Sequence, residues 1–320
     1  MSQESQHIPV LLNEIIDILS PDSEGIYVDG TIGLGGHASA ILDASIPNGR
    51  VIGIDLDPHA LELTSNRLGN RDNRLTLVHD NFRDLDQILT QNSVSAVDGI
   101  LLDLGVSSMQ LNTPDRGFSF LHSGQLDMRM NPNQRISALK IVNETKTDQL
   151  ANIIYEFGEE RWSRRIARAI DKARRTSKIM TTQQLAETIS SAVPRKKRYQ
   201  RIHPATRTFQ ALRIAVNQEL ESLDIVLNHA IAALKSGGKL CVISFHSLED
   251  RIVKRRFQEL AKPSNDFSIE SAHQNLLPPP IEIVTKRPIT ASEEEIAKNP
   301  RARSAKLRVC IKICESRITN

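Results

Sequence analysis

Short apolar segments alternate with amphipathic ones along the first hundred residues. Strands are expected at 25–28, 50–55, 75–78 and 97–103, since each is a compact run of apolar residues. The second and fourth are apolar almost throughout, which is typical of strands covered by helices on both faces of a parallel sheet. One intervening helix is marked by Asp57 as its N-cap, Pro58 at its first position and Gly69 just past its end. The alternation predicts a doubly wound α/β domain.

The alternation stops near residue 109, and only helical patterns and loops follow until about residue 201. The clearest predicted helices are Thr147–Phe157, Glu159–Arg175 and Thr181–Val193. We interpret 109–201 as an all-helical domain inserted into a Rossmann-like α/β domain that is formed by 1–108 and 202–320.

The α/β pattern resumes beyond Pro204. Apolar residues at intervals of three and four predict one long helix that reaches Leu234 and ends at Gly237 and Gly238. A strand is expected at 239–245. Two further strands are predicted in the C-terminal part, with a charged loop at 286–306 between them: Ile281–Val284 and Leu307–Ile313.

Charge is unevenly distributed in a chain of otherwise ordinary globular composition. The 320 residues are 39% hydrophobic and 25% charged, with a formal net charge of only +3. The stretch from Arg161 to Arg213, however, holds 15 Lys and Arg residues against two acids, Asp171 and Glu187. This excess favours an anionic partner, most simply nucleic acid. For the 164–175 part alone, a solvated helix face explains the charges equally well.

The cysteines and the termini indicate a soluble, cytoplasmic protein. Cys241, Cys310 and Cys314 fit neither a disulfide framework nor a paired metal-ligand spacing, and buried, inert thiols are expected. The N-terminus lacks the apolar stretch of a signal peptide, and no run is long enough to span a membrane.

The region 26–38 contains the most informative turn of the chain. A predicted strand ends at Asp29, four glycines occur within seven residues, and a helix-forming segment follows. Glycines let a ligand approach the backbone closely, and a helix N-terminus attracts anionic groups. This indicates a turn that binds a nucleotide-like cofactor, the alternative being an ordinary strand-to-helix turn.

Gly33-x-Gly35-x-x-Ala38 matches the dinucleotide fingerprint, with Asp55 about twenty residues later. The fingerprint does not separate NAD from S-adenosylmethionine, because both contain a ribose. Further acids at strand ends favour the methyl donor: Asp29 suits an amino acid moiety, and Asp80-Asn81-Phe82 suits an adenine. With Asp103, four acids are expected along one crevice beyond the strand ends.

Longer motifs carry a family resemblance that extends from residue 7 to about residue 309. The chain resembles the bacterial ribosomal RNA small subunit methyltransferase H family, also called the MraW family. The segments that match are HIPVLLNE, VDGTIGLGGHA, GIDLDP, DLGVSSMQL, DRGFSF, LDMRM, FGEER, RIHPATRTFQALRIAVNQEL, VISFHSLEDRIVK and NPRARSAKLRV.

The resemblance implies S-adenosyl-L-methionine as cofactor and methylation of the exocyclic N4 of a cytidine in the 16S rRNA decoding centre. It implies 16S rRNA or the small ribosomal subunit as partner. It places Gly35, Gly36 and His37 at the methionine end of the cofactor, Asp55 on the ribose, Phe82 beside the adenine, and Asp103 and Gln110 at the remaining contacts.

Asp103 is also the candidate catalytic residue. The lone pair of a cytosine amino group is delocalised into the ring, so an acceptor for its N–H assists attack on the methyl group. A role as cofactor ligand or cap only is an equal alternative. Tyr199 and His203 are candidate rings for stacking on RNA bases, with a plain loop tyrosine as the alternative for the former.

His246 is expected either to touch substrate or to serve as a hydrogen-bonded structural histidine. Its spacing from Glu249 suggests a metal, but no third ligand occurs nearby in the sequence, so no metal site is predicted. Two other functions stay open at this point. One is an NAD-dependent oxidoreductase on the same glycine turn, and the other is a non-catalytic RNA-binding ribosome-assembly protein.

Overall fold

The computed structural model describes residues 8–69, 71–194, 203–265 and 276–313, and the chain forms two compact units. The first unit is Met1–Gly105 together with Leu220–Asn320, and the second is Val106–Glu219. Among the described residues, the first unit has two hydrophobic cores and the second unit has one.

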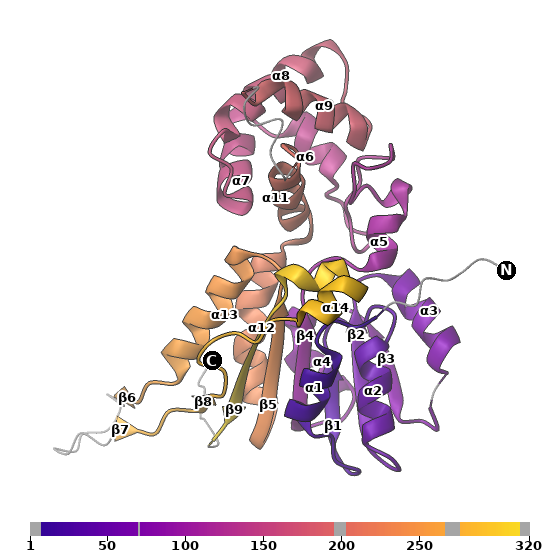
Figure 1. Cartoon of the computed structure of the whole chain (residues 1–320), viewed down its shortest axis with the longest axis vertical. Helices are drawn as coiled ribbons and strands as arrows, with labels where there is room; N and C mark the ends of the chain where they lie inside the picture. The colour runs from indigo at the N-terminus through magenta and orange to yellow at the C-terminus, as the bar shows by residue number, and fades with distance from the viewer. Residues whose placement is uncertain (1–7, 70, 195–202, 266–275, 314–320) are drawn as a thin grey trace. The chain divides into compact units, whose positions relative to one another are not determined.

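A seven-stranded sheet with the order β3-β2-β1-β4-β5-β9-β8 forms the centre of the first unit (Figure 1). β3, β2, β1, β4 and β5 run parallel, whereas β9 pairs antiparallel with β5 and β8 antiparallel with β9. The predicted α/β Rossmann-like fold is confirmed. The strands are β1 (Ile26–Asp29), β2 (Arg50–Asp55), β3 (Leu75–His79), β4 (Val97–Asp103), β5 (Leu234–Ser244), β8 (Ile281–Ile283) and β9 (Lys306–Lys312).

Side chains alternate between the two faces of this sheet, and each face has its own core. On β4, Ile100 and Leu102 enter one core while Leu101 enters the other. Helices α4 (Leu85–Gln91), α12 (Glu219–Ala233) and α13 (Ser247–Leu260) cover the first face, and helices α1 (Leu12–Leu19), α2 (Gly36–Ala44) and α3 (Pro58–Leu68) cover the second. Burial on both faces explains the continuous apolar runs of the inner strands.

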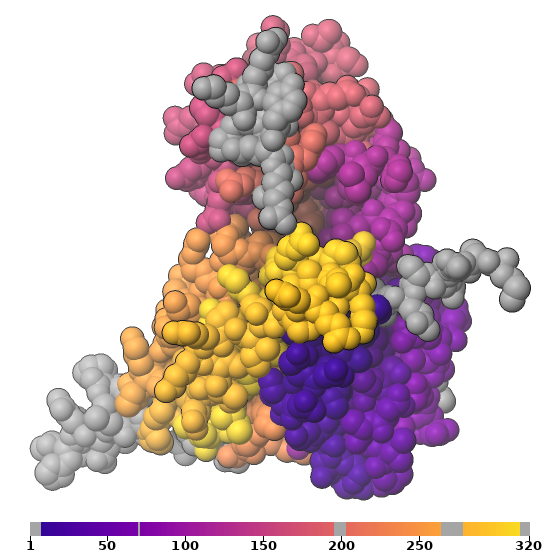
Figure 2. Space-filling model, viewed as in Figure 1, coloured from indigo at the N-terminus to yellow at the C-terminus, as the bar shows by residue number. Residues whose placement is uncertain are grey.

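The C-terminal part differs most from the prediction, because the expected charged loop at 286–306 contains α14 (Glu293–Lys298) and a 3₁₀ turn (Pro300–Ser304). Glu295 Oε1 accepts a hydrogen bond from Leu11 N at 2.8 Å, and Asn299 Nδ2 donates to Ile8 O at 3.1 Å. Figure 2 shows this yellow segment packed against the indigo N-terminal residues. A two-stranded sheet of β6 (Ser264–Asn265) and β7 (Leu276–Leu277) completes the first unit.

The long helix predicted beyond Pro204 is wrong, because the chain forms two helices there. Gln218 adopts a left-handed conformation with φ of 51° and separates α11 (Thr206–Asn217) from α12. The Asn217 side chain turns away to bond Met130 N and Met128 O at 2.8 Å each. The predicted end at Gly237 and Gly238 is also wrong, since β5 already begins at Leu234.

The second unit consists of helices around one core that includes Phe118, Ile154, Ile166 and Leu212. It spans 106–219 rather than the expected 109–201, because α11 packs against α7 and α6 instead of against the sheet. Its helices are α5 (Ser108–Asn112), α6 (Ala138–Glu144), α7 (Thr147–Gly158), α8 (Ser163–Thr176), α9 (Thr182–Ala192) and α11, with a 3₁₀ turn at Pro114–Arg116.

Several motif residues of this unit hold its backbone together. A Cβ on Gly158 would lie 2.6 Å from Arg207 O, so glycine allows α7 and α11 to approach closely. Asp127 and Arg129 form a two-point ion pair at 2.6 and 2.8 Å, and Arg129 Nη1 also donates to Pro132 O and Gln134 O. These residues therefore have a structural role.

Cys241 and Cys310 are free and buried in the sheet, as expected for inert thiols. Burial raises the pKa of the Cys241 thiol to about 12 and raises the pKa of Cys310 as well. Cys314 lies outside the described residues. Among the helices of the described part of the chain, none combines the length and apolar character needed to cross a bilayer.

Candidate cofactor site at the strand ends of the first unit

The order of strands reverses between β1 and β4, and in open α/β sheets ligands bind beyond the carboxyl ends of the strands at such a point. Asp29 is the last residue of β1, and Asp55 and Asp103 are the last residues of β2 and β4. Asp80 follows β3 by one residue. Since these four strands are neighbours and parallel, the acids lie in a row along one edge of the sheet.

The glycine turn after β1 is held from three sides. Gly30 N donates to Leu101 O on β4 at 2.9 Å, and Gly33 N donates to Asp55 Oδ2 at the end of β2 at 2.8 Å. From α3, Thr64 Oγ1 donates to Gly33 O at 2.7 Å. Sequence reasoning missed Thr64, because a threonine inside a helix gives no sign that it supports a distant turn.

Gly35 and Gly36 have specific steric reasons to be glycine. Gly35 precedes α2 with φ of 72°, in the left-handed region that other residues rarely adopt. A Cβ on Gly36 would lie only 2.4 Å from Pro9 Cγ, so the N-terminal segment packs directly on this residue. This packing fixes the backbone at the start of α2. The first N–H groups of a helix have no acceptor within the helix, so they can donate to another group there.

His37 is 5% exposed and connects the N-terminal segment to the strand-end acids. Its Nε2 lies 2.9 Å from Val10 O, so this nitrogen carries the proton and donates to the carbonyl. Its Nδ1 lies 3.8 Å from Asp103 Oδ2. The structure thus brings two of the predicted site residues together.

Asp103 is the most unusual group of the site. Its Oδ1 is buried and has no hydrogen-bond partner among the described residues, although the side chain as a whole is 19% exposed. Its backbone N–H donates to Thr31 Oγ1 at 2.6 Å, which positions it beside the glycine turn. Burial, with the charges of Asp29 and Glu249, raises the pKa of Asp103 to about 8.

Asp29 and Asp55 are perturbed in the same direction. Burial raises the pKa of Asp29 to about 7, against a hydrogen bond from Thr31 N, and the charge of Asp55 adds to the increase. Burial raises the pKa of Asp55 to about 6, while hydrogen bonds from Asp57 N and Gly33 N oppose the increase. Three neighbouring carboxyl groups therefore favour a cationic or hydroxyl-rich ligand, which would lower these pKa values.

Phe82 begins a 3₁₀ turn (Phe82–Asp84) after β3, and its Cβ lies 3.4 Å from where a Cβ on Gly30 would be. Its half-buried ring therefore belongs to the surroundings of the glycine turn. The neighbouring Asn81 is used structurally, since its Nδ2 donates to Ser222 Oγ at 3.2 Å and its Oδ1 accepts from Arg83 N at 3.0 Å.

Gln110 belongs to the second unit, where it is 4% exposed. It forms a capping box with Ser107 at the start of α5: Gln110 N donates to Ser107 Oγ at 3.2 Å, and Gln110 Oε1 accepts from Ser107 N at 3.1 Å. Its expected contact with the cofactor stays a prediction.

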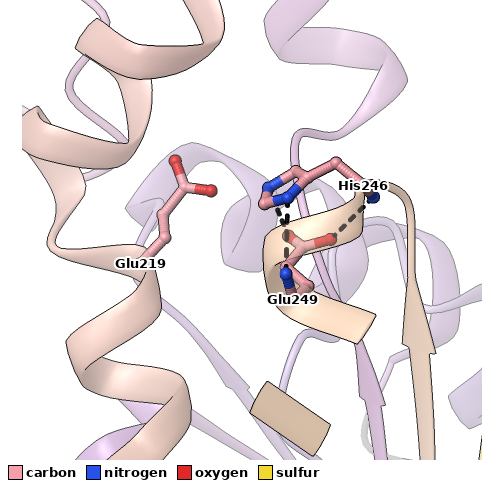
Figure 3. A group of neighbouring side chains, drawn as sticks. All are labelled: Glu219, His246 and Glu249. Atoms are coloured by element: carbon pink, nitrogen blue, oxygen red, sulfur yellow. Dashed lines mark hydrogen bonds and ion pairs between the residues drawn. The ribbon is translucent and has the colours of Figure 1, made fainter. Parts of the chain in front are cut away.

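His246 caps α13 together with Glu249 (Figure 3). Its Nδ1 accepts from Glu249 N at 3.4 Å, and Glu249 Oε2 accepts from Phe245 N at 2.8 Å and from His246 N at 3.2 Å. These contacts support the structural interpretation of His246. Glu219, which is also labelled, ends the second unit and forms a two-point ion pair with Arg213 at 2.7 and 2.9 Å. The expectation that no metal is bound stays a prediction.

His203 is exposed and lies in the second unit, where its ring packs against Phe120 with centroids 4.7 Å apart. Its Nδ1 accepts from Ala205 N at 3.2 Å next to the start of α11. Tyr199 and the basic run 195–201 lie outside the described residues.

Comparison with known proteins identifies the family. The model of the MraW methylase family matches residues 4–313. The chain belongs to the MraW methylase family. Relatives named ribosomal RNA small subunit methyltransferase H share 49% identity in Geobacter sp. strain M21 and 48% in Halothermothrix orenii; the alignments cover 97% and 96% of this chain and 100% and 99% of those proteins. The relative in Heliobacterium modesticaldum is 47% identical, with 96% of this chain and 98% of that protein covered.

Membership of the MraW methylase family confirms the resemblance carried by the motifs and disfavours the oxidoreductase interpretation. The match of the Gly33-x-Gly35-x-x-Ala38 spacing to the dinucleotide fingerprint is then incidental.

Proposed function

We propose that this chain transfers a methyl group from S-adenosyl-L-methionine to the exocyclic N4 of a cytidine in the decoding centre of 16S rRNA. Methyl transfer to small-subunit ribosomal RNA is supported by the names of relatives that align over nearly the whole chain. The cytidine and its N4 rest on the family resemblance. Such an enzyme would act in the cytoplasm, where bacterial ribosomal subunits assemble.

One observation carries the cofactor assignment. The buried carboxyl group of Asp29 and the half-buried carboxyl groups of Asp55 and Asp103 lie at the strand ends beside a tightly held glycine turn, and Asp103 Oδ1 lacks a partner among the described residues. An ammonium group and ribose hydroxyls are donors that suit these acceptors. Gly35, Gly36 and His37 would hold the methionine end, Asp55 the ribose and Phe82 the adenine. Asp103 and Gln110 would supply further contacts.

Bound S-adenosylmethionine supplies a methyl group that is already activated by its sulfonium, so the chain mainly aligns the acceptor. We assign Asp103 a second role as acceptor for an N–H of the target amine. This role requires the carboxylate form. A cation bound beside Asp103 lowers its pKa, which otherwise lies near 8. His37 Nδ1 lies 3.8 Å from Asp103 Oδ2, so the imidazole borders the carboxyl group.

The second unit would recognise the RNA. It carries much of the basic stretch that begins at Arg161, together with the exposed residue His203. A base must leave its stack before an exocyclic amine can reach a methyl donor, and aromatic rings and cations assist that step in RNA-modifying proteins.

Two measurements test the proposal. S-adenosylhomocysteine should raise the melting temperature of the protein, whereas NAD should not, because occupancy stabilises the folded state by mass action. Incubation with labelled S-adenosylmethionine and small ribosomal subunits should yield N4-methylcytidine on nucleoside mass analysis. Stabilisation by NAD, or no methylated cytidine with either subunits or free 16S rRNA, would overturn the assignment.

A further inference from the structure

Helix α8 of the second unit has a strongly one-sided surface. Ser163, Ile166, Ala167 and Ile170 are buried in the core of the unit. At about 100° per residue, their directions centre on the side opposite to a run of cations. We call this run the α8 cation stripe; it consists of Arg164, Arg165, Arg168, Lys172 and Arg175, all exposed.

Four of the five cations of the stripe form no described side-chain contact that would stabilise the fold of the unit. Arg164, Arg165, Arg168 and Lys172 have no ion pair or side-chain hydrogen bond among the described residues, whereas Arg175 pairs with Asp171 at 2.7 Å. By contrast, the half-buried Arg174 pairs with Asp171 at 2.8 Å and donates to Val142 O at 2.8 Å. Like charges four residues apart, such as Arg164 with Arg168, repel each other and destabilise an isolated helix.

The local charge is almost entirely of one sign. From Arg161 to Lys178 the chain has eight Lys and Arg residues and one acid, Asp171. The stripe from Arg164 to Arg175 runs for about 16 Å along the helix at about 1.5 Å per residue. A line of cations of this length fits a regularly spaced row of negative charges better than a single anion.

We propose that the α8 cation stripe binds the sugar–phosphate backbone of the RNA substrate, tracking successive phosphates without reading bases. This inference rests on the proposed function, in which the substrate is RNA. Arginine and lysine side chains on an exposed helix face contact phosphates in a sequence-independent way and release condensed counterions. The stripe therefore sets affinity and orientation for the RNA, while the choice of the methylated base belongs elsewhere.

The test compares two triple variants of equal charge change in the full-length protein. The stripe variant is Arg164→Gln, Arg168→Gln and Lys172→Gln, since glutamine is a good helix former. The control variant is Arg135→Gln, Lys140→Gln and Lys146→Gln, three exposed cations of the same unit with no ion pair among the described residues. Binding of a labelled 16S rRNA fragment is measured by fluorescence anisotropy between about 50 and 200 mM KCl. Over this range the loss of a few phosphate contacts changes the salt dependence of the affinity by roughly tenfold or more.

Affinity for RNA decreases as salt increases, and each phosphate contact contributes roughly 0.7–0.9 to the magnitude of the slope of log affinity against log salt. In the stripe variant, which lacks three cations, the magnitude of this slope should be smaller by about two to three. Its KM for small subunits should rise about tenfold or more, with kcat, melting temperature and S-adenosylhomocysteine affinity retained. A lysine-retaining variant, Arg164→Lys with Arg168→Lys, should keep the wild-type slope, because charge rather than fork geometry is used.

An unchanged slope in the stripe variant, or equal losses in both triple variants, would overturn the inference. Absence of subunit methylation by the wild-type protein would bear on the proposed function and not on the stripe. If the wild-type protein binds RNA through the stripe but methylates nothing, the proposed function fails and the phosphate-binding surface stands. If the wild-type protein methylates subunits and the stripe variant does so with unchanged KM and salt slope, the stripe does not bind the RNA backbone. The proposed methyltransferase function then still holds.

Discussion

Replacing Asp103 with asparagine should change how stability depends on pH. Burial raises the pKa of Asp103 from 3.8 to about 8. Between about pH 4 and pH 8 the folded state therefore holds a proton that the unfolded state has lost, so the stability of the wild-type protein falls as pH rises through this window. Asparagine has nearly the same shape and cannot ionise, so Asp103→Asn removes this loss.

The size of the effect follows from the pKa difference. At about 1.4 kcal/mol per pKa unit, full expression of the difference corresponds to about 6 kcal/mol. Between pH 5 and pH 9 only the part of the difference above pH 5 is expressed, about 3 pKa units or about 4 kcal/mol. Since the side chain is 19% exposed and solvent screens its charge, we discount this by roughly half and expect about 2 kcal/mol. For a unit of this size that is a relative gain in melting temperature of about 4 °C or more at pH 9 compared with pH 5.

The assay is thermal unfolding of cofactor-free wild type and Asp103→Asn at pH 5, 7 and 9. Asp80→Asn is the matched control, because Asp80 follows β3 at the same edge and its carboxylate accepts from Asn81 N. A difference between Asp103→Asn and wild type that stays constant from pH 5 to pH 9 would refute the reasoning. In the same proteins, cofactor affinity and turnover are measured separately: intact turnover per bound cofactor with weakened binding would exclude Asp103 from the chemistry.

Three further substitutions test the site and the second unit. Asp55→Ala removes the acceptor for Gly33 N and Asp57 N, so S-adenosylhomocysteine affinity by calorimetry should fall at least about tenfold, as expected for about 1.4 kcal/mol; unchanged affinity would separate Asp55 from the cofactor. Gly36→Ala places a Cβ 2.4 Å from Pro9 Cγ and should cost about 1–3 kcal/mol of stability in chemical denaturation, and a wild-type midpoint would contradict the packing argument. Arg129→Met breaks the ion pair with Asp127 and leaves Pro132 O and Gln134 O without this donor, so proteolysis within 106–219 should accelerate while S-adenosylhomocysteine still protects the first unit.

Much of the first unit was predictable from local pattern. The bounds of β2 and β4 match the apolar runs at 50–55 and 97–103, because an inner strand with both faces covered is apolar along its whole length. The helix start at Asp57 and Pro58 was predictable for a similarly local reason, since Asp57 Oδ1 accepts from His59 N and proline needs no donor at that position. Acids at strand ends could be counted along the sequence, and parallel pairing placed them along one edge.

Other features depend on contacts between residues far apart in the chain. The break at Gln218 is not visible in the apolar spacing, because it depends on Asn217 bonding to Met128 and Met130 nearly ninety residues earlier. Residues 293–304 are rich in charged side chains, and for that reason the sequence predicts a loop there. The segment forms a helix and a 3₁₀ turn because Glu295 and Asn299 bond to backbone groups of the N-terminal segment.

For the site, the sequence by itself determined which chemical groups are present: the glycines, the strand-end carboxylates and a line of cations at helical spacing. Tertiary structure decided their state. Burial without a partner raises the pKa of Asp103, the approach of Pro9 requires glycine at 36, and the core under α8 turns its cations outward as one stripe. The physical reason is that residue type follows from local chemistry, whereas solvation and charge depend on neighbours that only the folded chain brings together.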